Sequence, residues 1–148
     1  MVLIGVFVGF ISTRSRYGLR FLIDLAEQGQ AGPIDLASIA ARQEISEQYL
    51  SKLTQPLKAA GLVRTERGAK GGYELAKAPH TIDLWTVVEA LEGHSALLEC
   101  SSHPESCPRS NSCRTLPVWT GLDRVVRDYL ERISLADAAR LAEPDYTI

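Results

Sequence analysis

Three cysteines lie within one short polar stretch, "CSSHPESCPRSNSC", which runs from Cys100 to Cys113 and holds every cysteine of the chain. An odd number of cysteines does not build a closed set of disulfides, so the clustering indicates metal ligation or reactive thiols in a reducing cytoplasm. Six residues separate Cys100 from Cys107, and five separate Cys107 from Cys113. Thiolates are soft ligands that suit iron–sulfur clusters and zinc.

The spacing leaves the chemistry of these thiols open. An iron–sulfur cluster and a structural zinc ion each take four ligands as a rule, and His103 is the nearest candidate for the fourth, unless it is an ordinary solvated loop histidine. Zinc sites usually contain two cysteines separated by two to four residues, which this stretch lacks. Metal-free thiols that oxidise as a switch are the third alternative.

Composition limits what kind of protein carries this stretch. The chain has 148 residues, enough for one domain with an appendage. Residues 1–75 carry nine Lys/Arg against seven Asp/Glu, whereas residues 76–148 carry seven against eleven, so a polyanion would bind the N-terminal half. There is no Cys-x-x-Cys, phosphate loop or Ser/His/Asp order, and we therefore expect no enzyme.

The first residues, 1–11, form an atypical apolar extension. This run is shorter than the about 20 apolar residues that span a bilayer, and it lacks the basic start of a signal peptide. We expect no membrane segment and a cytoplasmic protein.

Periodicity predicts a helix–turn–helix between residues 15 and 57. Apolar spacing predicts a helix over 15–28, Asp35 is a capping residue for a second helix, and Ser46 caps a third that begins at Glu47. The third helix separates an apolar face from a polar one, and Pro56 should kink it or end its regular part. Its polar face suits base edges and phosphates, although many helices show such a face to solvent; it consists of Gln48, Ser51, Lys52 and Gln55.

A basic, glycine-rich turn follows the third helix. Residues 63–66 and 73–75 read as two short strands, and the turn between them carries Arg67 and Lys70 beside three glycines. A β-hairpin directly after a helix–turn–helix is a wing, and glycines let its backbone approach a DNA surface closely.

The C-terminal half should be a helix from Leu84 to Gly93, an irregular cysteine loop over 99–114, a long helix over 116–133, a last short helix and a frayed tail over 141–148. On the long helix, apolar residues recur at alternating spacings of three and four, a seam that favours a dimer interface over packing on its own domain. The seam consists of Trp119, Leu122, Val126, Tyr129 and Ile133.

Four segments together resemble the Rrf-two family of bacterial winged-helix transcriptional regulators, with its IscR-like, NsrR-like and CymR-like branches. They are "STRSRYGLR" at 12–20, "ISEQYLSKLTQPLKAAGLV" at 45–63, "RGAKGGYEL" at 67–75 and the three cysteines before "LPVW". The resemblance covers nearly all of residues 12–140 and leaves the leader without a counterpart. It implies a mainly α fold: a winged helix-turn-helix DNA-binding domain over 12–80 with a two-stranded β wing, then residues 81–140 with a long C-terminal dimerisation helix.

The resemblance also implies a homodimer that binds a pseudo-palindromic double-stranded DNA operator. It adds DNA-binding residues to those of the polar helix face and the wing, namely Arg14, Arg16, Tyr17, Tyr49, Gly68 and Gly71. In cluster-binding members three such cysteines hold a 2Fe-2S or 4Fe-4S cluster, so the resemblance favours Cys100, Cys107 and Cys113 as ligands of a redox, iron or nitric-oxide sensor. The family's fourth ligands fall here on Leu116 and Arg16, which do not ligate. A cluster-free regulator that works through a partner protein, zinc or thiol oxidation stays open.

Overall fold

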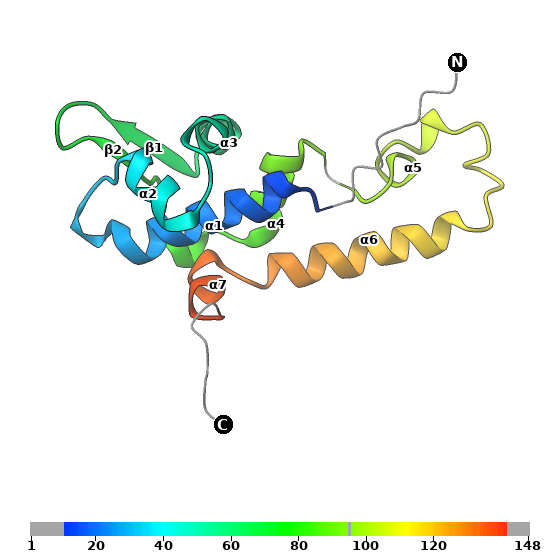
Figure 1. Cartoon of the computed structure of the whole chain (residues 1–148). Helices are drawn as coiled ribbons and strands as arrows, with labels where there is room; N and C mark the ends of the chain where they lie inside the picture. The colour runs from blue at the N-terminus through cyan, green and yellow to red at the C-terminus, as the bar shows by residue number, and fades with distance from the viewer. Residues whose placement is uncertain (1–10, 95, 142–148) are drawn as a thin grey trace, which may run out of the picture.

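Within residues 11–94 and 96–141, which the computed structural model describes, the chain forms seven α-helices and one antiparallel hairpin (Figure 1). The mainly α class predicted from the sequence is confirmed. The α-helices and strands are α1 (Thr13–Gln28), α2 (Leu36–Gln43), α3 (Glu47–Ala59), β1 (Val63–Glu66), β2 (Gly72–Leu75), α4 (Leu84–Glu92), α5 (Glu99–Ser102), α6 (Leu116–Glu131) and α7 (Leu135–Leu141).

Side-chain caps fix where the first helices begin. The Ser12 hydroxyl accepts from the backbone of Arg14, Asp35 accepts from Ser38, and Ser46 accepts from Tyr49. Each cap satisfies a backbone donor that the first turn leaves unpaired. The predicted caps at Asp35 and Ser46 are confirmed, and they set the short connection between α2 and α3.

A single apolar cluster joins α1, α2, α3, α4, β1 and α7 into one body. Phe21 and Leu22 of α1 and Leu50 and Leu57 of α3 are fully buried in this cluster. Burying a side chain of this size contributes about 1.5–3 kcal/mol. The cluster therefore holds the polar face of α3 outward.

Pro56 does not end α3. The helix continues to Ala59, and Ala60 donates to the carbonyl of Pro56 at 3.0 Å. Pro56 lacks the N–H that would bond back to Lys52, but the apolar face of α3 stays packed on both sides of it. Tertiary packing thus overrides the local break expected from the sequence.

The hairpin depends on two adjacent glycines. β1 and β2 pair antiparallel, and Tyr73 exchanges two backbone hydrogen bonds with Ile34, at 2.9 and 2.7 Å. A Cβ on Gly71 would lie 2.2 Å from the carbonyl oxygen of Glu66, and one on Gly72 would lie 2.3 Å from that of Ile34. Only glycine fits where backbones approach this closely.

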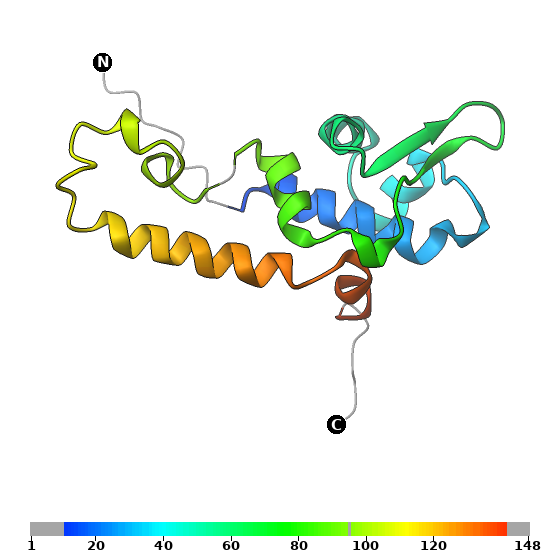
Figure 2. The same cartoon turned by 180° about the vertical axis from the view of Figure 1, so that it is seen from behind.

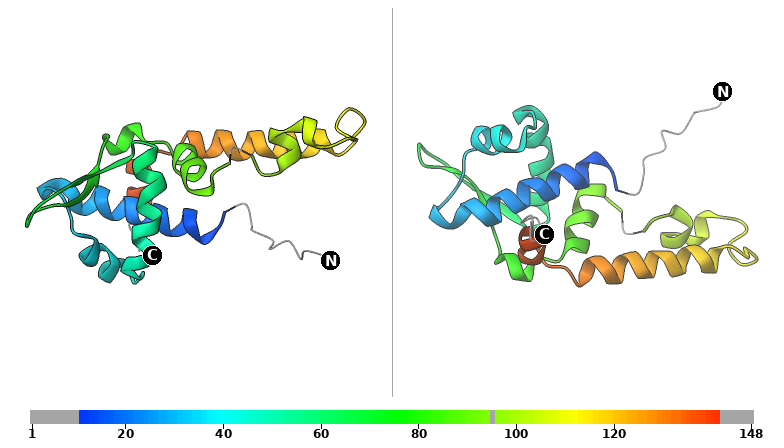
Figure 3. Two further views of the ribbon diagram at one scale, coloured as in Figure 1. Left: turned by 90° about the horizontal axis from the view of Figure 1, so that it is seen from above. Right: turned by 60° about the horizontal axis from the view of Figure 1, so that its bottom comes forward.

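α6 extends away from this body as an arm, with the cysteine segment beside it and at its far end (Figures 1 and 2). The helix ends at Glu131, two residues before the predicted end at Ile133. The chain then returns to the body, where Leu84 donates to the Ile133 carbonyl at 2.9 Å and Leu135 donates to that of Ile82 at 2.7 Å. The views from above and below show the same separation of arm and body (Figure 3).

Short helices interrupt the segment that was expected to be irregular. Cys100 lies in α5, and a 3-10 turn (Pro104–Ser106) follows it. At the other end, α7 extends to Leu141, the first residue of the predicted tail. The rest of that tail and the first ten residues lie outside the described residues. In the described part, no helix is long and apolar enough to cross a membrane.

Candidate nucleic-acid interface and cysteine segment

The outer face of α3 presents the polar groups predicted to read DNA. Gln48, Lys52 and Gln55 are exposed and Ser51 is half-buried, because the leucines of the same helix face the core. Amide and ammonium groups on a fixed helix face can reach base edges and phosphates. The structure therefore brings these four predicted residues to one surface.

Tyr49 joins α3 to the start of α1. Its ring meets that of Tyr17 edge to face, with centroids 6.0 Å apart, and its hydroxyl lies 3.4 Å from Thr13 Oγ1. An edge-to-face pair of this kind is worth about 0.5–1.5 kcal/mol beyond its buried area. The two tyrosines thus connect two elements of the predicted interface.

Arg20 belongs to this surface although the sequence did not single it out. Its guanidinium lies 5.3 Å from the centroid of the Tyr17 ring, and it donates to the Gln43 side chain at 3.2 Å and to the Gln43 carbonyl. The available signal was its position one helical turn after Tyr17 on an exposed face. Arg20 adds positive charge beside the tyrosine pair.

The two arginines at the start of α1 lie in different places. Arg14 is exposed and its Nη2 lies 3.7 Å from Glu92 Oε2. Arg16 instead lines a small apolar pocket with Leu84 and Leu130, toward α4 and α6. The structure therefore places Arg16 apart from Tyr17, the other α1 residue predicted to contact DNA.

Glu92 fixes the first turn of α1 from across the chain. Its Oε1 accepts from the Ser12 backbone at 2.9 Å, from the Ser12 hydroxyl at 2.8 Å and from the Ser15 hydroxyl at 2.6 Å. The side chain is 0% exposed. Burial raises the pKa of this carboxyl, but the hydrogen bonds from Ser15 and Ser12 and the charge of Arg14 outweigh it and hold the pKa below the ordinary 4.5.

A buried ion pair holds α2 against α1. Arg42 bonds both oxygens of Asp24, at 2.7 and 2.9 Å, and Gln43 donates to the same carboxylate at 2.9 Å. The hydrogen bond to Asp24 raises the pKa of Arg42, and Asp24 is almost completely buried. This bidentate pair sets the angle at which α2 leads into α3.

The wing tip presents the predicted cations to solvent. Arg67, Gly68 and Lys70 are exposed, and Gly68 has a positive φ of 108° that favours glycine. The wing is held to α3, where the hydroxyls of Thr54 and Tyr73 lie 3.4 Å apart. The helix face and the wing are thus parts of one rigid body.

The three cysteines occupy both ends and the middle of the segment between α5 and α6. Each thiol is free and half-buried. Cys100 lies in α5, whereas Cys113 precedes α6 by two residues. Among the described residues, no group of three or more His, Cys, Asp or Glu side chains is gathered as a metal site. The donors fit an iron–sulfur cluster or zinc by their chemistry, and the structure does not bring them together.

Cys113 has the surroundings of a thiolate. Its Sγ lies 3.4 Å from Thr115 Oγ1, and the hydrogen bonds from the Thr115 side chain and from the backbone of Thr115 and Leu116 lower the pKa of this thiol below its ordinary 9.0. The thiolate is the form that ligates metals and reacts with oxidants.

His103 is largely exposed, and its Nδ1 lies 3.2 Å from Glu105 Oε1. This contact lowers the pKa of Glu105, after the larger contribution of the backbone hydrogen bond at Glu105 itself. A carboxylate on one ring nitrogen leaves the other, Nε2, free to ligate, as metal-bound histidines usually do.

The predicted seam of α6 divides in two. Trp119, Leu122 and Tyr129 are exposed, whereas Val126 and Ile133 are half-buried against the chain's own residues. Two apolar residues that the sequence reading missed complete the exposed set. This apolar stripe, with exposures between 40% and 65%, consists of Val118, Trp119, Leu122, Val125 and Tyr129.

A helix–turn–helix followed by a hairpin, with a cation-bearing tip and a polar helix face, defines a winged-helix, DNA-binding transcriptional regulator. The chain belongs to the Rrf2 family. The family model described as "Iron-dependent Transcriptional regulator" matches residues 11–140. The homologues of this family are regulators, not enzymes.

Known relatives cover most of the chain. Protein rrf2 of Nitratidesulfovibrio vulgaris is 40% identical over 130 residues, which are 88% of this chain and 87% of that protein. The structure of CymR, the global cysteine regulator of B. subtilis, matches with a TM-score of 0.72 at 35% identity, covering 90% of this chain and 98% of that one. The structure of T. potens IscR matches with a TM-score of 0.74 at 35% identity, covering 93% and 91%.

Proposed function

We propose that this regulator acts as a homodimer on a pseudo-palindromic operator in the cytoplasm and senses redox, iron or nitric-oxide state through an iron–sulfur cluster. The observation that carries the sensing role is the placement of the three cysteines. Cys100 is part of α5 and Cys113 lies just before α6, so a group held by both would tie these two helices together.

The DNA-binding part of the proposal assigns two roles. The α3 face, with Gln48 and Lys52 exposed, would enter the major groove, and Arg67 at the wing tip would reach the adjacent minor groove. Tyr17 and Tyr49 hold the start of α1 against α3, where Arg14 can contact the phosphate backbone.

The dimer would form along α6. Its exposed apolar stripe is continuous over Val118, Leu122, Val125 and Tyr129, at spacings of four, three and four residues. That spacing is the repeat of a two-helix seam. A dimer through this arm would place two winged helices on opposite half-sites of the operator.

When bound, an iron–sulfur cluster would supply redox and nitric-oxide chemistry at this segment, with Cys100, Cys107 and Cys113 as its ligands. The lowered pKa of Cys113 favours the ligating thiolate. His103 Nε2 is the candidate fourth ligand, since Glu105 occupies the other face of the ring.

Purification without oxygen tests the sensor directly. We expect a coloured protein with stoichiometric iron and sulfide and visible absorption that bleaches in air. Cys107→Ser should lose iron and colour, whereas the matched Ser106→Ala should keep both. A colourless wild-type protein without iron or sulfide would refute the cluster.

The thiolate-favouring environment of Cys113 supports a second candidate function, a cluster-free regulator that responds through thiol oxidation, possession of zinc or a protein co-regulator. In that case the metal-free, reduced protein binds its operator with full affinity, and Cys113→Ser abolishes the response to peroxide while Cys107→Ser leaves operator binding unchanged.

A further inference from the structure

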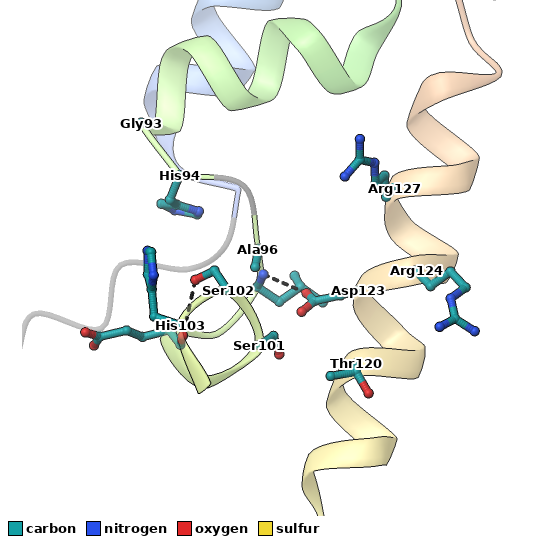
Figure 4. A pocket seen from close by; sticks show the side chains of 12 residues that line it. Gly93, His94, Ala96, Ser101, Ser102, His103, Thr120, Asp123, Arg124 and Arg127 are labelled. Carbon is teal, nitrogen blue, oxygen red and sulfur yellow. Dashed lines mark hydrogen bonds between the residues drawn. The ribbon is translucent and has the colours of Figure 1, made fainter. Parts of the chain in front are cut away.

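A cavity of about 810 Å³ lies between the 93–103 segment and the side of α6 that faces it (Figure 4). Its volume falls in the range of sites for small molecules. The α6 side of the cavity is polar and includes Thr120, Asp123 and Arg127. On the opposite wall are Ser101 and Ser102, which follow Cys100 in α5.

The cavity and the proposed dimer interface use opposite faces of α6. Residues of an α-helix advance by about 100° each. Thr120, Asp123 and Arg127 therefore share one side, while Leu122 and Val125 of the apolar stripe point to the other. A partner subunit packed on the stripe would leave the cavity open.

Two buried polar atoms of the cavity wall lack a partner among the described residues, Ser101 Oγ and Asp123 Oδ2. The other oxygen of Asp123 accepts from the Leu97 backbone at 2.6 Å, so this carboxylate is held in place from one side. A buried polar atom without a hydrogen bond costs about 1–3 kcal/mol. An acceptor and a hydroxyl are thus left for a ligand that brings its own donors and acceptors.

Asp123 and Arg127 stand one helical turn apart, and no ion pair joins them among the described residues. Arg127 instead bonds Glu131 through Nε at 2.7 Å, and its guanidinium lies 5.4 Å from the centroid of the Trp85 ring. Figure 4 shows Arg127 on the cavity side of α6, whereas Arg124 points away. One carboxylate and one guanidinium therefore face the same space without neutralising each other.

We propose that this cavity binds a small amino-acid-like zwitterion. Its ammonium group would donate to Asp123 Oδ2, and its carboxylate would accept from Arg127 and from the Ser101 hydroxyl. Side chains at this helical spacing have Cβ atoms about 5–6 Å apart, a separation that suits two opposite charges joined through one carbon. The site needs neither a cluster nor DNA, and a ligand in it would brace α5, which carries Cys100, against α6.

Calorimetric titration of the full chain with each proteinogenic L-amino acid, without DNA, tests this site. At least one amino acid should bind saturably with one site per chain, while acetate and methylammonium, which each carry half of the charge pair, should not. Asp123→Asn should weaken binding by about tenfold or more, the loss expected for a hydrogen bond to a charged group. The matched Asp128→Asn, on an exposed part of the same helix, should bind like the wild type.

Two further readouts separate the site from a folding defect. Ser101→Ala keeps every α6 contact and should also weaken binding, with an unchanged circular dichroism spectrum. Bound ligand should change the fluorescence of Trp85, because Arg127 lies over its ring. The proposal is wrong if no amino acid binds saturably, if acetate or methylammonium binds equally well, or if Asp123→Asn and Ser101→Ala, both folded, bind like the wild type.

Discussion

The winged-helix body and the α6 arm differ in what holds them together. In the body, Phe21, Leu50 and Leu57 are fully buried in one apolar cluster. In the arm, no described residue from 93 to 134 is buried, and five large apolar side chains of α6 are exposed. The body can reach its conformation from its own contacts, whereas the arm presents its apolar surface to a partner.

This difference divides the work of a regulator. A DNA-reading surface needs a fixed geometry, and the body provides it through caps, the Asp24–Arg42 pair and the Glu92 contacts. A sensor needs a segment whose arrangement depends on what binds it, and the arm has few internal contacts that would oppose such a change. The segment with the cysteines lies in the arm.

The largest effect should come from breaking the arm's apolar stripe. The double substitution Leu122→Glu with Val125→Glu places two charges on the exposed face and should convert the proposed dimer to a monomer. Loss of the second half-site should weaken operator binding by about 10²–10⁴-fold. Sedimentation and binding to DNA selected by the wild-type protein measure both. Arg124→Glu changes the net charge equally on the other side of α6 and should stay dimeric; a dimeric double variant would contradict the stripe's role.

The next effect should come from the body. Arg42→Met leaves the buried Asp24 carboxylate without its bidentate partner and should cost about 3 kcal/mol of unfolding free energy, measured with urea. Arg64→Met is the matched control, because Arg64 also bonds a carboxylate through Nε, that of Glu74, but at the surface. Its cost should stay below about 1 kcal/mol. Equal losses in the two variants would show that the Asp24 pair does not hold α2.

Local signals were sufficient to predict much of the body. Asp35, Ser46 and Asp83 each accept the backbone hydrogen bond expected of a capping residue, and Gly93 ends α4 with a positive φ of 77°. Capping and apolar periodicity act over a few residues, so a sequence displays them directly. The order of helix, helix and hairpin then fixed the fold class.

Features that depend on distant partners were not predicted. Glu92 meets Ser12 and Ser15 across about eighty residues of chain, and nothing near Glu92 indicates that contact. On α6, Val125 is exposed and Val126 is half-buried, because α6 lies against the body from one particular side. Apolar periodicity identifies a stripe, but the direction from which a helix packs is set by tertiary contacts.

The wing tip should show a smaller effect that separates base reading from charge. Arg67→Ala should reduce discrimination between operator and random DNA by about 1–3 kcal/mol, whereas Lys70→Ala should weaken binding to both and lower the salt slope by about 1. Both side chains are exposed at the same tip, so each is the control for the other. Binding titrations at several salt concentrations measure both; an unchanged discrimination in Arg67→Ala would argue against the wing in the groove.

The smallest expected effect concerns Glu92, where the body meets the start of the arm. Its pKa is lowered in the folded chain, so its stabilising contribution is present above the ordinary pKa of 4.5 and is lost as the pH falls through the folded value. Glu92→Gln should therefore cost about 1 kcal/mol at neutral pH, and the difference from the wild type should shrink in urea titrations below about pH 4.5. Glu89→Gln, on the same helix and without a side-chain hydrogen bond among the described residues, should show no such pH dependence. A constant difference across that range would mean that the Glu92 carboxylate contributes through its shape and not its charge.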